Sequence, residues 1–263
     1  MKKKSIFGFS FFIMICTLLF FYIPIFTLAI NSFNNSKYSV AWNGFTLKWY
    51  IQMFNNQELI SALYNSIIIG IIAALFAMII GTIAAFCIYY YRSKLQFIHK
   101  NIFLIQLVVP DIFIGISILF FFTVVFKWEL GLFTTIITHI TFCIVYVVVI
   151  VYSRLQYLQY SIIESAIDLG ASWISIYRFI LIPFIFPSIL AGGLLAFTVS
   201  LDDFIITFFV TGSGNITLPV YIYSMLKHGD FSIINALSTL MIVGTIIIII
   251  CLKDFLFLNR NKK

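Results

Sequence analysis

Six long apolar stretches separated by polar gaps constrain this chain more than any other feature. They lie at about residues 7–30, 62–88, 101–126, 132–152, 179–210 and 233–252. A bilayer core roughly 30 Å thick is crossed by about 20 apolar helical residues, so each stretch is long enough to span it. A lone strand in lipid would leave its backbone N–H and C=O groups unpaired, so the spans must be helical. The sequence therefore predicts an all-α integral membrane protein with six transmembrane helices.

The composition agrees with a chain solvated by lipid rather than by water. Of the 263 residues, 62% are hydrophobic and 10% are charged, whereas a soluble domain carries roughly 25% charged residues. The formal net charge of +7 suggests nucleic acid as a possible partner. The Lys and Arg residues, however, lie in the gaps between apolar stretches and form no basic stripe. The charge is better explained by membrane topology than by nucleic-acid binding.

The basic residues predict how the chain is oriented in the membrane. Both termini and the even-numbered gaps hold twelve of the sixteen Lys and Arg residues; the odd-numbered gaps hold Lys37, Lys48, Lys127 and Lys227. Because cytoplasmic loops carry the excess of basic residues, both the N and the C terminus are expected in the cytoplasm. The run after Lys2–Lys4 is too long for a signal peptide and has no small-residue cleavage site, which predicts a retained first span.

Two of the gaps are too long to be plain connectors. The external segment from Asn31 to about Ser61 is polar with several aromatic residues, and a short helix is expected around Lys48–Phe54. The cytoplasmic segment Ser153–Arg178 has a helical pattern and moderate hydrophobicity, so it is expected on or below the membrane surface. In the second span, small residues recur every four positions and predict close approach of another helix. They are Ala73, Ala77, Gly81 and Ala85.

A motif in the cytoplasmic segment carries most of the functional information. It consists of Glu164, Ser165, Ala166, Asp168, Gly170 and Ala171, followed by Pro183 at the start of the next span. Ser161 as N-cap, with Glu164 three residues later, is a capping-box pattern for a short helix over 161–169. Gly170 suits the left-handed position that ends such a helix. Pro183 and Pro187 are expected to begin or bend the fifth span.

This segment resembles the EAA loop of ABC importer permeases. The family pattern is E-A-A, three residues, G, nine residues, I, one residue and L-P, and the matching positions are Glu164, Ala166, Gly170, Ile180 and Pro183. Ser165 replaces an alanine of the pattern and Ile182 a leucine. The resemblance implies that a coupling helix near residues 161–171 docks into a groove of a separate ATP-binding subunit. The alternative is an ordinary amphipathic connector between two spans.

Other sequence patterns separate the possible classes of function. The chain contains no G-x-x-x-x-G-K-[ST] phosphate loop, so ATP and Mg are expected on the partner subunit, with no cofactor bound by this chain. No Cys/His cluster has metal-ligand spacing. An intramembrane protease is disfavoured because G-x-G-D, H-E-x-x-H and G-x-S-x-G are all absent. An ion-driven secondary carrier is disfavoured by the lack of inverted repeats. A transport subunit, not an enzyme, is the expected class.

Segments across nearly the whole chain are similar to PotC-type permeases of spermidine/putrescine ABC transporters. They include Asn31–Asn34, Lys48–Tyr50, Pro110–Ile112, Val151–Leu155, Asp168–Ser172 and Ser200–Asp203. The resemblance implies a type I ABC importer permease fold in the inner membrane with polyamines as cargo; the alternative is a related permease for iron or thiamine. It divides the chain into the first span with a long external loop (1–58), the transmembrane core (59–252) and a cytoplasmic tail (253–263). The implied partners are a second, PotB-like permease subunit, a dimer of ATP-binding subunits and an extracytoplasmic polyamine-binding protein.

Three carboxylates lie inside the predicted spans, Asp111 near the middle of the third and Asp202 and Asp203 in the outer half of the fifth. A carboxylate at the centre of a span costs roughly 2.5–3.5 kcal/mol on insertion scales, so each is expected to face a polar interior or a partner. No Lys or Arg lies within the spans, and these carboxylates are predicted to line the path of a polycationic amine, with Trp49 as an aromatic contact. Alternatively, Asp203 caps a break in its span and Trp49 is an interfacial anchor. His139 is expected to form a helix-to-helix hydrogen bond rather than a proton relay.

Overall fold

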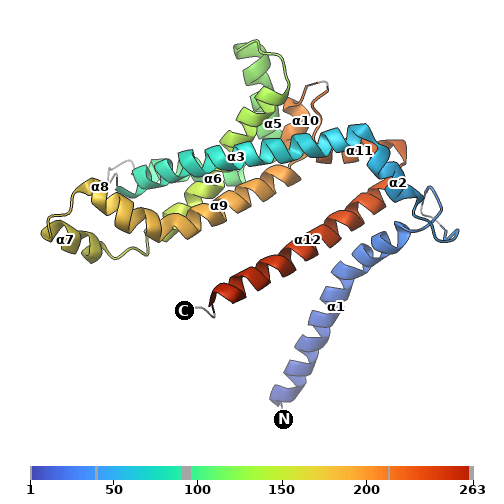
Figure 1. The fold of residues 1–263 in the computed structure, drawn as a ribbon, viewed down its shortest axis with the longest axis horizontal. Coiled ribbons are helices and arrows are strands. Elements are labelled where there is room, and N and C mark those ends of the chain that lie inside the picture. The colour runs from blue at the N-terminus through green and yellow to red at the C-terminus, as the bar shows by residue number, and fades with distance from the viewer. Residues whose placement is uncertain (1, 39–40, 91–95, 213, 261–263) are drawn as a thin grey trace. The chain divides into compact units, whose positions relative to one another are not determined.

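The structure is a computed structural model that describes residues 2–38, 41–90, 96–212 and 214–260. Within these ranges the chain is mostly helical, and its one extended pairing is an isolated antiparallel bridge between Asn34 and Phe45. The helices of Figure 1 are α1 (Lys2–Asn31), α2 (Lys48–Asn55), α3 (Gln57–Tyr90), α4 (Gln96–Val108), α5 (Asp111–Phe120), α6 (Leu132–Leu155), α7 (Tyr160–Asp168), α8 (Trp173–Ile176), α9 (Ile182–Asp202), α10 (Ile205–Val210), α11 (Leu218–His228) and α12 (Phe231–Arg260). The prediction of an all-helical protein is confirmed.

Several helical segments of the described chain are long and apolar enough to cross a membrane. Four qualify by themselves: Ser10–Asn31, Gln57–Tyr90, Leu132–Leu155 and Trp173–Asp202. The bent pair Asn101–Val108 and Asp111–Val125 would make a fifth, and Phe231–Ile247 is a shorter apolar helix. The predicted membrane character is therefore confirmed, while the count of six spans and the side on which the termini lie stay predictions.

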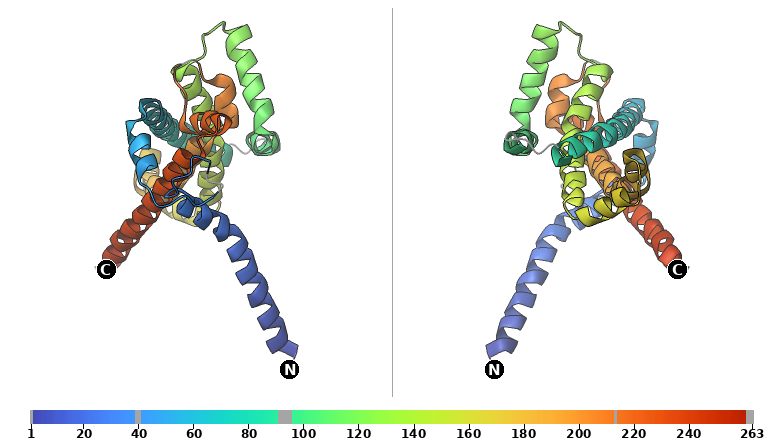
Figure 2. Two further views of the ribbon diagram at one scale, coloured as in Figure 1. Left: turned by 90° about the vertical axis from the view of Figure 1, so that its right-hand side faces the viewer. Right: turned by 90° about the vertical axis from the view of Figure 1, so that its left-hand side faces the viewer.

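The third predicted stretch, 101–126, is not one straight helix. α4 ends at Val108, α5 begins at Asp111, and the chain bends by 107° between them (Figure 2). Pro110 explains the break, because proline lacks the N–H of a helical hydrogen bond and disfavours helical conformation at Val109. Asp111 consequently lies in the first turn of α5 and not in the middle of a continuous span, which corrects the sequence-based placement.

The fifth predicted stretch, 179–210, also has different boundaries. The helical segment begins at Trp173, passes through a π-helical turn at Tyr177–Leu181 and ends at Asp202. Arg178 lies inside this segment with its guanidinium carbon 5.5 Å from the centre of the Phe179 ring, so a charge assigned to a gap is accommodated within a helix. Asp203 is extended, with φ −69° and ψ 119°, and separates α9 from α10.

The chain forms two compact units, residues 1–60 with 222–263 and residues 61–221. In the second unit, α3, α6 and α9 pack at the small residues that the sequence singled out. A Cβ atom added to Gly81 of α3 would lie 2.8 Å from the Cβ of Val147 in α6. A Cβ added to Gly192 of α9 would lie 3.2 Å from the Cα of the same valine. The other members of the α3 stripe, Ala73, Ala77 and Ala85, are completely buried. The predicted close helix approach is confirmed.

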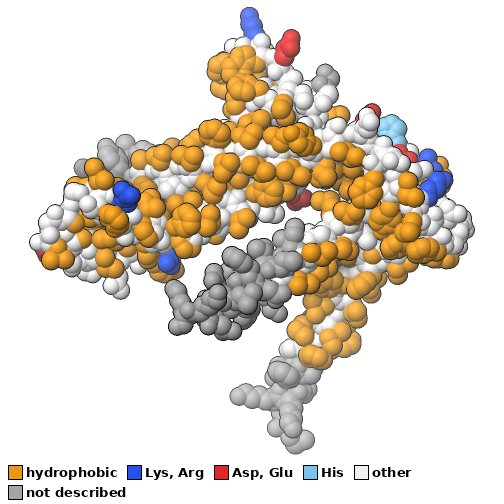
Figure 3. All heavy atoms as spheres, viewed as in Figure 1, with side chains coloured by type: hydrophobic (Ala, Val, Ile, Leu, Met, Phe, Trp, Pro, Cys, Tyr) orange, Lys and Arg blue, Asp and Glu red, His pale blue; other side chains and the backbone are white. Residues whose placement is uncertain are grey.

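The outer surface of these helices is apolar. Figure 3 shows hydrophobic side chains over most of the visible face of α3 and α9. Ile79 and Ile83 of α3 are about three-fifths exposed and Leu194 of α9 is 69% exposed. Water would not stabilise such a surface, so lipid or another apolar chain must cover it.

The first unit contains the segment that the sequence predicts to be external, and the short helix predicted in it is confirmed as α2. The loop before α2 is organised by the buried side chain of Asn34. Its amide nitrogen donates to the Ala41 carbonyl (2.8 Å), and its amide oxygen accepts from the backbone N–H groups of Asn43 (2.9 Å) and Ser36 (3.2 Å). One side chain thus satisfies three backbone groups of the segment before α2.

Candidate functional site

The start of the predicted coupling helix differs from the capping-box prediction. α7 begins at Tyr160, and its N-cap residue Gln159 makes no capping side-chain bond. Ser161 therefore lies inside the helix, where its carbonyl accepts a hydrogen bond from the Ser165 hydroxyl (2.8 Å). The Ser161 N-cap prediction was wrong, because the N-cap lies two residues earlier, at Gln159. A serine followed three residues later by Glu indicates a helix start only within a residue or two.

The end of α7 agrees with the prediction for Gly170. Gly170 has φ +79°, in the left-handed region. Its N–H donates to the Ile167 carbonyl (2.8 Å), and the N–H of Ala171 donates to the Ala166 carbonyl (2.9 Å). This pair of bonds is the Schellman arrangement, which satisfies the last carbonyls of a helix through a left-handed glycine. The sequence thus fixes where α7 stops and turns toward α8.

An apolar cluster fastens α7 to the membrane helices. Ile163 is completely buried beside Leu158, Ile176 and Leu181, and Ala166 and Ala171 pack against this cluster. Phe86 and Tyr90, near the end of α3, contact the same cluster. The cluster therefore joins α7 to the end of α3 and to the π-helical turn that precedes α9.

The opposite side of this segment is open. Glu164, Ser165 and Asp168 are exposed. Leu169 is 88% exposed and Ile174 is 79% exposed. The large exposed apolar side chains on this face are typical of a protein-interaction surface.

Pro183 lies in the first turn of α9, directly after the π-helical turn. The helix is continuous here, so the missing N–H of Pro183 falls where π-helical hydrogen bonding changes to α-helical hydrogen bonding. Near it, the guanidinium carbon of Arg154 lies 4.2 Å from the centre of the Phe184 ring, and its Nε donates to the Phe184 carbonyl (3.4 Å). These contacts tie the end of α6 to the start of α9.

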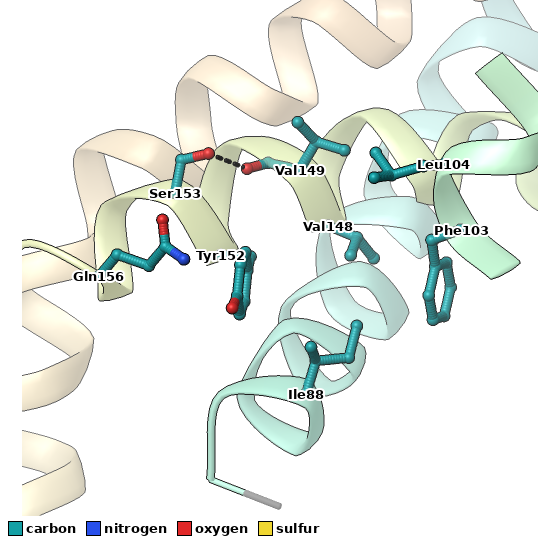
Figure 4. Close-up of a pocket in the computed structure, with 8 residues that line it drawn as sticks. All are labelled: Ile88, Phe103, Leu104, Val148, Val149, Tyr152, Ser153 and Gln156. Carbon is teal, nitrogen blue, oxygen red and sulfur yellow. Dashed lines mark hydrogen bonds between the residues drawn. The ribbon is translucent and has the colours of Figure 1, made fainter. Parts of the chain in front are cut away.

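A cavity of about 220 Å³ opens beside the end of α6. Figure 4 shows side chains of α3, α4 and α6 around it, and none of the lining residues is charged. They are Ile88, Phe103, Leu104, Val148, Val149, Tyr152, Ser153 and Gln156. The Ser153 hydroxyl donates to the Val149 carbonyl within its own helix (2.7 Å). The predicted path residues lie elsewhere.

Asp203 caps the break between α9 and α10. Its carboxylate accepts the backbone N–H of Ile206 (3.3 Å), the backbone N–H of Thr207 (2.8 Å) and the Thr207 hydroxyl (2.7 Å). Only 6% of the Asp203 side chain is exposed. Three donors at the N-terminal end of a helix stabilise a buried carboxylate, so this geometry supplies the capping role foreseen as the alternative. Asp202, its neighbour, is exposed.

His139 of α6 joins this cluster, and the predicted helix-to-helix hydrogen bond is confirmed. Its Nδ1 lies 2.7 Å from the Ser200 hydroxyl of α9, and its Nε2 lies 2.9 Å from the Thr207 hydroxyl of α10. The Nε2 is also 3.7 Å from a carboxylate oxygen of Asp203. Sequence reasoning missed Ser200 and Thr207. Their three- and four-residue spacing from Asp203 was the available signal, since such spacing places side chains on one helical face.

The remaining path candidates fall in different places. Asp111 is exposed in the first turn of α5. α5 packs on α10, since a Cβ added to Gly115 would lie 2.8 Å from the Phe209 ring. Trp49 belongs to the first unit and is buried, with its indole N–H donating to the Asn34 carbonyl (2.7 Å). That contact favours a structural role for Trp49, and its path role stays a prediction.

Sequence comparison identifies the family. The family model described as "Binding-protein-dependent transport system inner membrane component" matches residues 66–259, which include α7 and the α9–α10 break. The chain belongs to this family. It is a multi-pass protein of the inner membrane, as its apolar helices and the family indicate.

Individual relatives refine this assignment. The spermidine/putrescine transport system permease protein PotC of Escherichia coli K12 is 39% identical over 88% of this chain and 87% of its own length. PotC of Haemophilus influenzae is also 39% identical, over 88% of this chain and 90% of its own length. The putrescine transport system permease protein PotI of E. coli K12 is 38% identical over 93% of this chain and 89% of its own length. The resemblance to PotC-type permeases is confirmed.

Two solved structures share the fold. A chain of a bacterial ABC transporter that imports the acidic polysaccharide alginate matches with a TM-score of 0.73 and 13% identity, covering 97% of this chain and 98% of that one. A chain of the MetNI methionine ABC transporter in an inward-facing conformation matches with a TM-score of 0.60 and 18% identity, covering 75% and 91%. The helical arrangement is therefore that of ABC importer permeases.

Proposed function

We propose that this chain is the channel-forming permease subunit of an ATP-driven importer that moves polyamines inward across the inner membrane. The observation that carries the proposal is the identity of 38–39% to permeases of two polyamine transport systems over about nine-tenths of the chain. The alternative cargoes are iron and thiamine.

The chemistry of the membrane carboxylates supports a cationic cargo. Asp111 and Asp202 are exposed carboxylates at breaks in apolar helical segments. A polyamine that gives up water gains a charge-assisted hydrogen bond at each carboxylate, which a neutral solute cannot do. In this proposal Asp111, Asp202 and Asp203 belong to the substrate path, with Asp203 acting through the backbone that it caps.

We further propose that the α7 segment couples transport to a separate ATPase. Its docking face comprises Glu164, Ser165, Asp168 and the exposed Leu169, and Gly170 and Ala171 hold the turn that shapes it. Ala166 faces the supporting cluster, and Pro183 marks the start of the helix that receives the motion. ATP and Mg are bound by the partner, because the sequence has no phosphate loop.

The finer organisation follows the family pattern. The proposed topology has six transmembrane helices with both termini in the cytoplasm, in the type I importer arrangement. Residues 1–58 form the first span and the external loop, 59–252 the core and 253–263 the tail. The proposed assembly contains a second, PotB-like permease, two ATP-binding subunits and an extracytoplasmic polyamine-binding protein.

Uptake by the complete assembly tests the cargo. Labelled spermidine uptake should require ATP and all subunits, and excess putrescine should compete while iron and thiamine should not. Competition by iron or thiamine alone would replace the polyamine proposal by that cargo. The purified chain alone should show neither ATP hydrolysis nor uptake, and activity from it alone would contradict the permease proposal.

A further inference from the structure

Four buried side chains at the α9–α10 break form one directed chain of hydrogen bonds. The Thr207 hydroxyl donates its proton to Asp203 (2.7 Å), so it can only accept from the Nε2 of His139 (2.9 Å). Nε2 therefore carries a proton. A neutral imidazole then has an unprotonated Nδ1, which accepts from the Ser200 hydroxyl (2.7 Å). The order of donation is Ser200 to His139 to Thr207 to Asp203.

This chain of bonds joins three helices across a gap in the backbone ladder. Ser200 lies in the last turn of α9, Thr207 lies in α10, and His139 reaches both from α6. His139 is 1% exposed, Ser200 5% and Thr207 completely buried. An unpaired polar group is costly at such burial, so each of these side chains depends on partners that the other helices supply.

The two adjacent carboxylates next to this chain of bonds differ in exposure. Asp203 points into the protein because three donors and the histidine surround it, with 6% of its side chain exposed. Asp202 ends α9 and is exposed. Among the described residues, no hydrogen bond or ion pair reaches the carboxylate of Asp202. The Asp203 carboxylate is thus used in hydrogen bonds within the protein, and the Asp202 carboxylate is available to a cation.

We propose that His139 is a positioning residue for transport. It latches α6 to both sides of the α9–α10 break and thereby keeps Asp203 turned inward and Asp202 turned outward to meet the cargo. This inference rests on the proposed transport of a cationic amine. It gives the two neighbouring aspartates different roles: Asp203 caps the helix break, and Asp202 contacts the ammonium group of the cargo.

The latch, meaning the hydrogen bonds by which neutral His139 joins α6 to α9 and α10, requires different chemistry at position 139 than a proton relay does. The latch needs one donor and one acceptor at position 139, which a carboxamide also supplies, whereas a relay needs a group that titrates. His139→Gln and His139→Asn should therefore retain much of the function that His139→Ala loses. If His139→Ala does not assemble, Thr207→Val breaks the same chain between histidine and Asp203 with almost no change in volume.

The first test measures backbone hydrogen exchange in the assembled complex without substrate. In His139→Ala or Thr207→Val, amides of residues 204–211 should exchange at least about tenfold faster, because the cap and latch no longer hold α10. Thr138→Val is the matched control, since the Thr138 hydroxyl is buried in the same helix but bonds only within it, to the Thr134 carbonyl (2.7 Å). Unchanged exchange in both latch variants would overturn the proposal.

The second test is a double-mutant cycle on the KM of spermidine uptake. Asp202→Asn and His139→Ala should each raise KM about tenfold, the loss of one charge-assisted hydrogen bond. If His139 acts through Asp202, the double variant should also be raised about tenfold, whereas independent effects would multiply to about a hundredfold. Multiplicative effects, or a proton-relay pattern in which the carboxamide variants fail, would refute the positioning role. Absence of polyamine uptake in the wild-type complex would instead refute the cargo, and the exchange test would still decide whether the latch exists.

Discussion

Replacing Gly170 by alanine tests whether the shape of the coupling turn, rather than its chemistry, is needed for transport. Gly170 has φ +79°, and a Cβ added there would meet no atom within 4 Å. The substitution therefore creates no clash, and its cost comes from the backbone alone, about 1–2 kcal/mol for a left-handed L-residue. That cost corresponds to a factor of about 5–30 between the native turn and competing conformations.

The cost should appear as lost coupling. Both Schellman bonds depend on the left-handed residue, and they hold the exposed Leu169 and the end of α7 in place. In proteoliposomes that contain the whole complex, Gly170→Ala should lower the uptake achieved per ATP hydrolysed, by up to about tenfold, while membrane insertion stays normal. The assay measures labelled polyamine uptake and phosphate release in the same vesicles.

Two controls isolate the backbone effect. Gly170→Asn should restore most coupling, because asparagine adopts the left-handed conformation far more readily than alanine. Gly44→Ala introduces the same strain elsewhere, at φ +92° with no atom within 4 Å, and should leave the uptake per ATP unchanged. Wild-type coupling in Gly170→Ala, or equal damage from the asparagine and alanine variants, would refute the reasoning.

Three further substitutions separate packing, loop structure and docking. Gly81→Ala should destabilise the detergent-solubilised protein by about 1–3 kcal/mol, because the new methyl group would lie 2.8 Å from Val147. Gly244→Ala in α12 has open space around it and should not destabilise the protein. Thermal unfolding of both variants checks this. Trp49→Phe should lower the free energy of unfolding by about 1–3 kcal/mol, because the Asn34 carbonyl loses its buried donor. The segment before α2 should then become more sensitive to protease, while the KM of uptake stays unchanged. A raised KM with normal protease resistance would instead support Trp49 as a path residue. Leu169→Gln should alter stability by less than about 0.5 kcal/mol, since the side chain is 88% exposed. It should nevertheless weaken co-purification of the ATP-binding subunit. Undiminished co-purification would remove Leu169 from the docking face.

Features that depend on the local backbone were predictable from the sequence. The apolar lengths gave the membrane helices, the four-residue repeat of small residues gave the contact with α6, and Gly170 gave the end of α7. In each case the residue type restricts conformation or volume wherever it occurs, so no knowledge of the tertiary fold is required.

Helix boundaries and breaks were predicted less well. Pro110 was visible inside an apolar run, but apolarity alone does not distinguish a straight helix from two helices that meet at 107°. Arg178 suggested a gap, yet the structure keeps it helical beside the Phe179 ring. In both cases hydropathy reports how well a segment tolerates lipid, whereas the path of the backbone depends on individual hydrogen bonds and side-chain contacts.

The partners of the candidate site could not be predicted for a related reason. His139 lies 61 residues from Ser200 and 68 residues from Thr207 along the chain. Their meeting depends on the register between α6 and the α9–α10 segment, which is set by contacts such as Val147 against Gly192. Sequence periodicity identifies the face of each helix, and only packing decides which residues of two faces become neighbours.

The carboxylates of the membrane segments divide according to what compensates their charge. Asp203 is compensated within the chain by two backbone amides and the Thr207 hydroxyl, so it needs no external cation. Among the described residues, no hydrogen bond or ion pair reaches the carboxylates of Asp111 and Asp202. Both side chains are exposed at the ends of apolar helices. A bare carboxylate in hydrocarbon would cost roughly 2.5–3.5 kcal/mol on insertion scales. These two side chains must therefore face water, another subunit or a passing cation, and a path for polyamines supplies the first and the last of these at the same place.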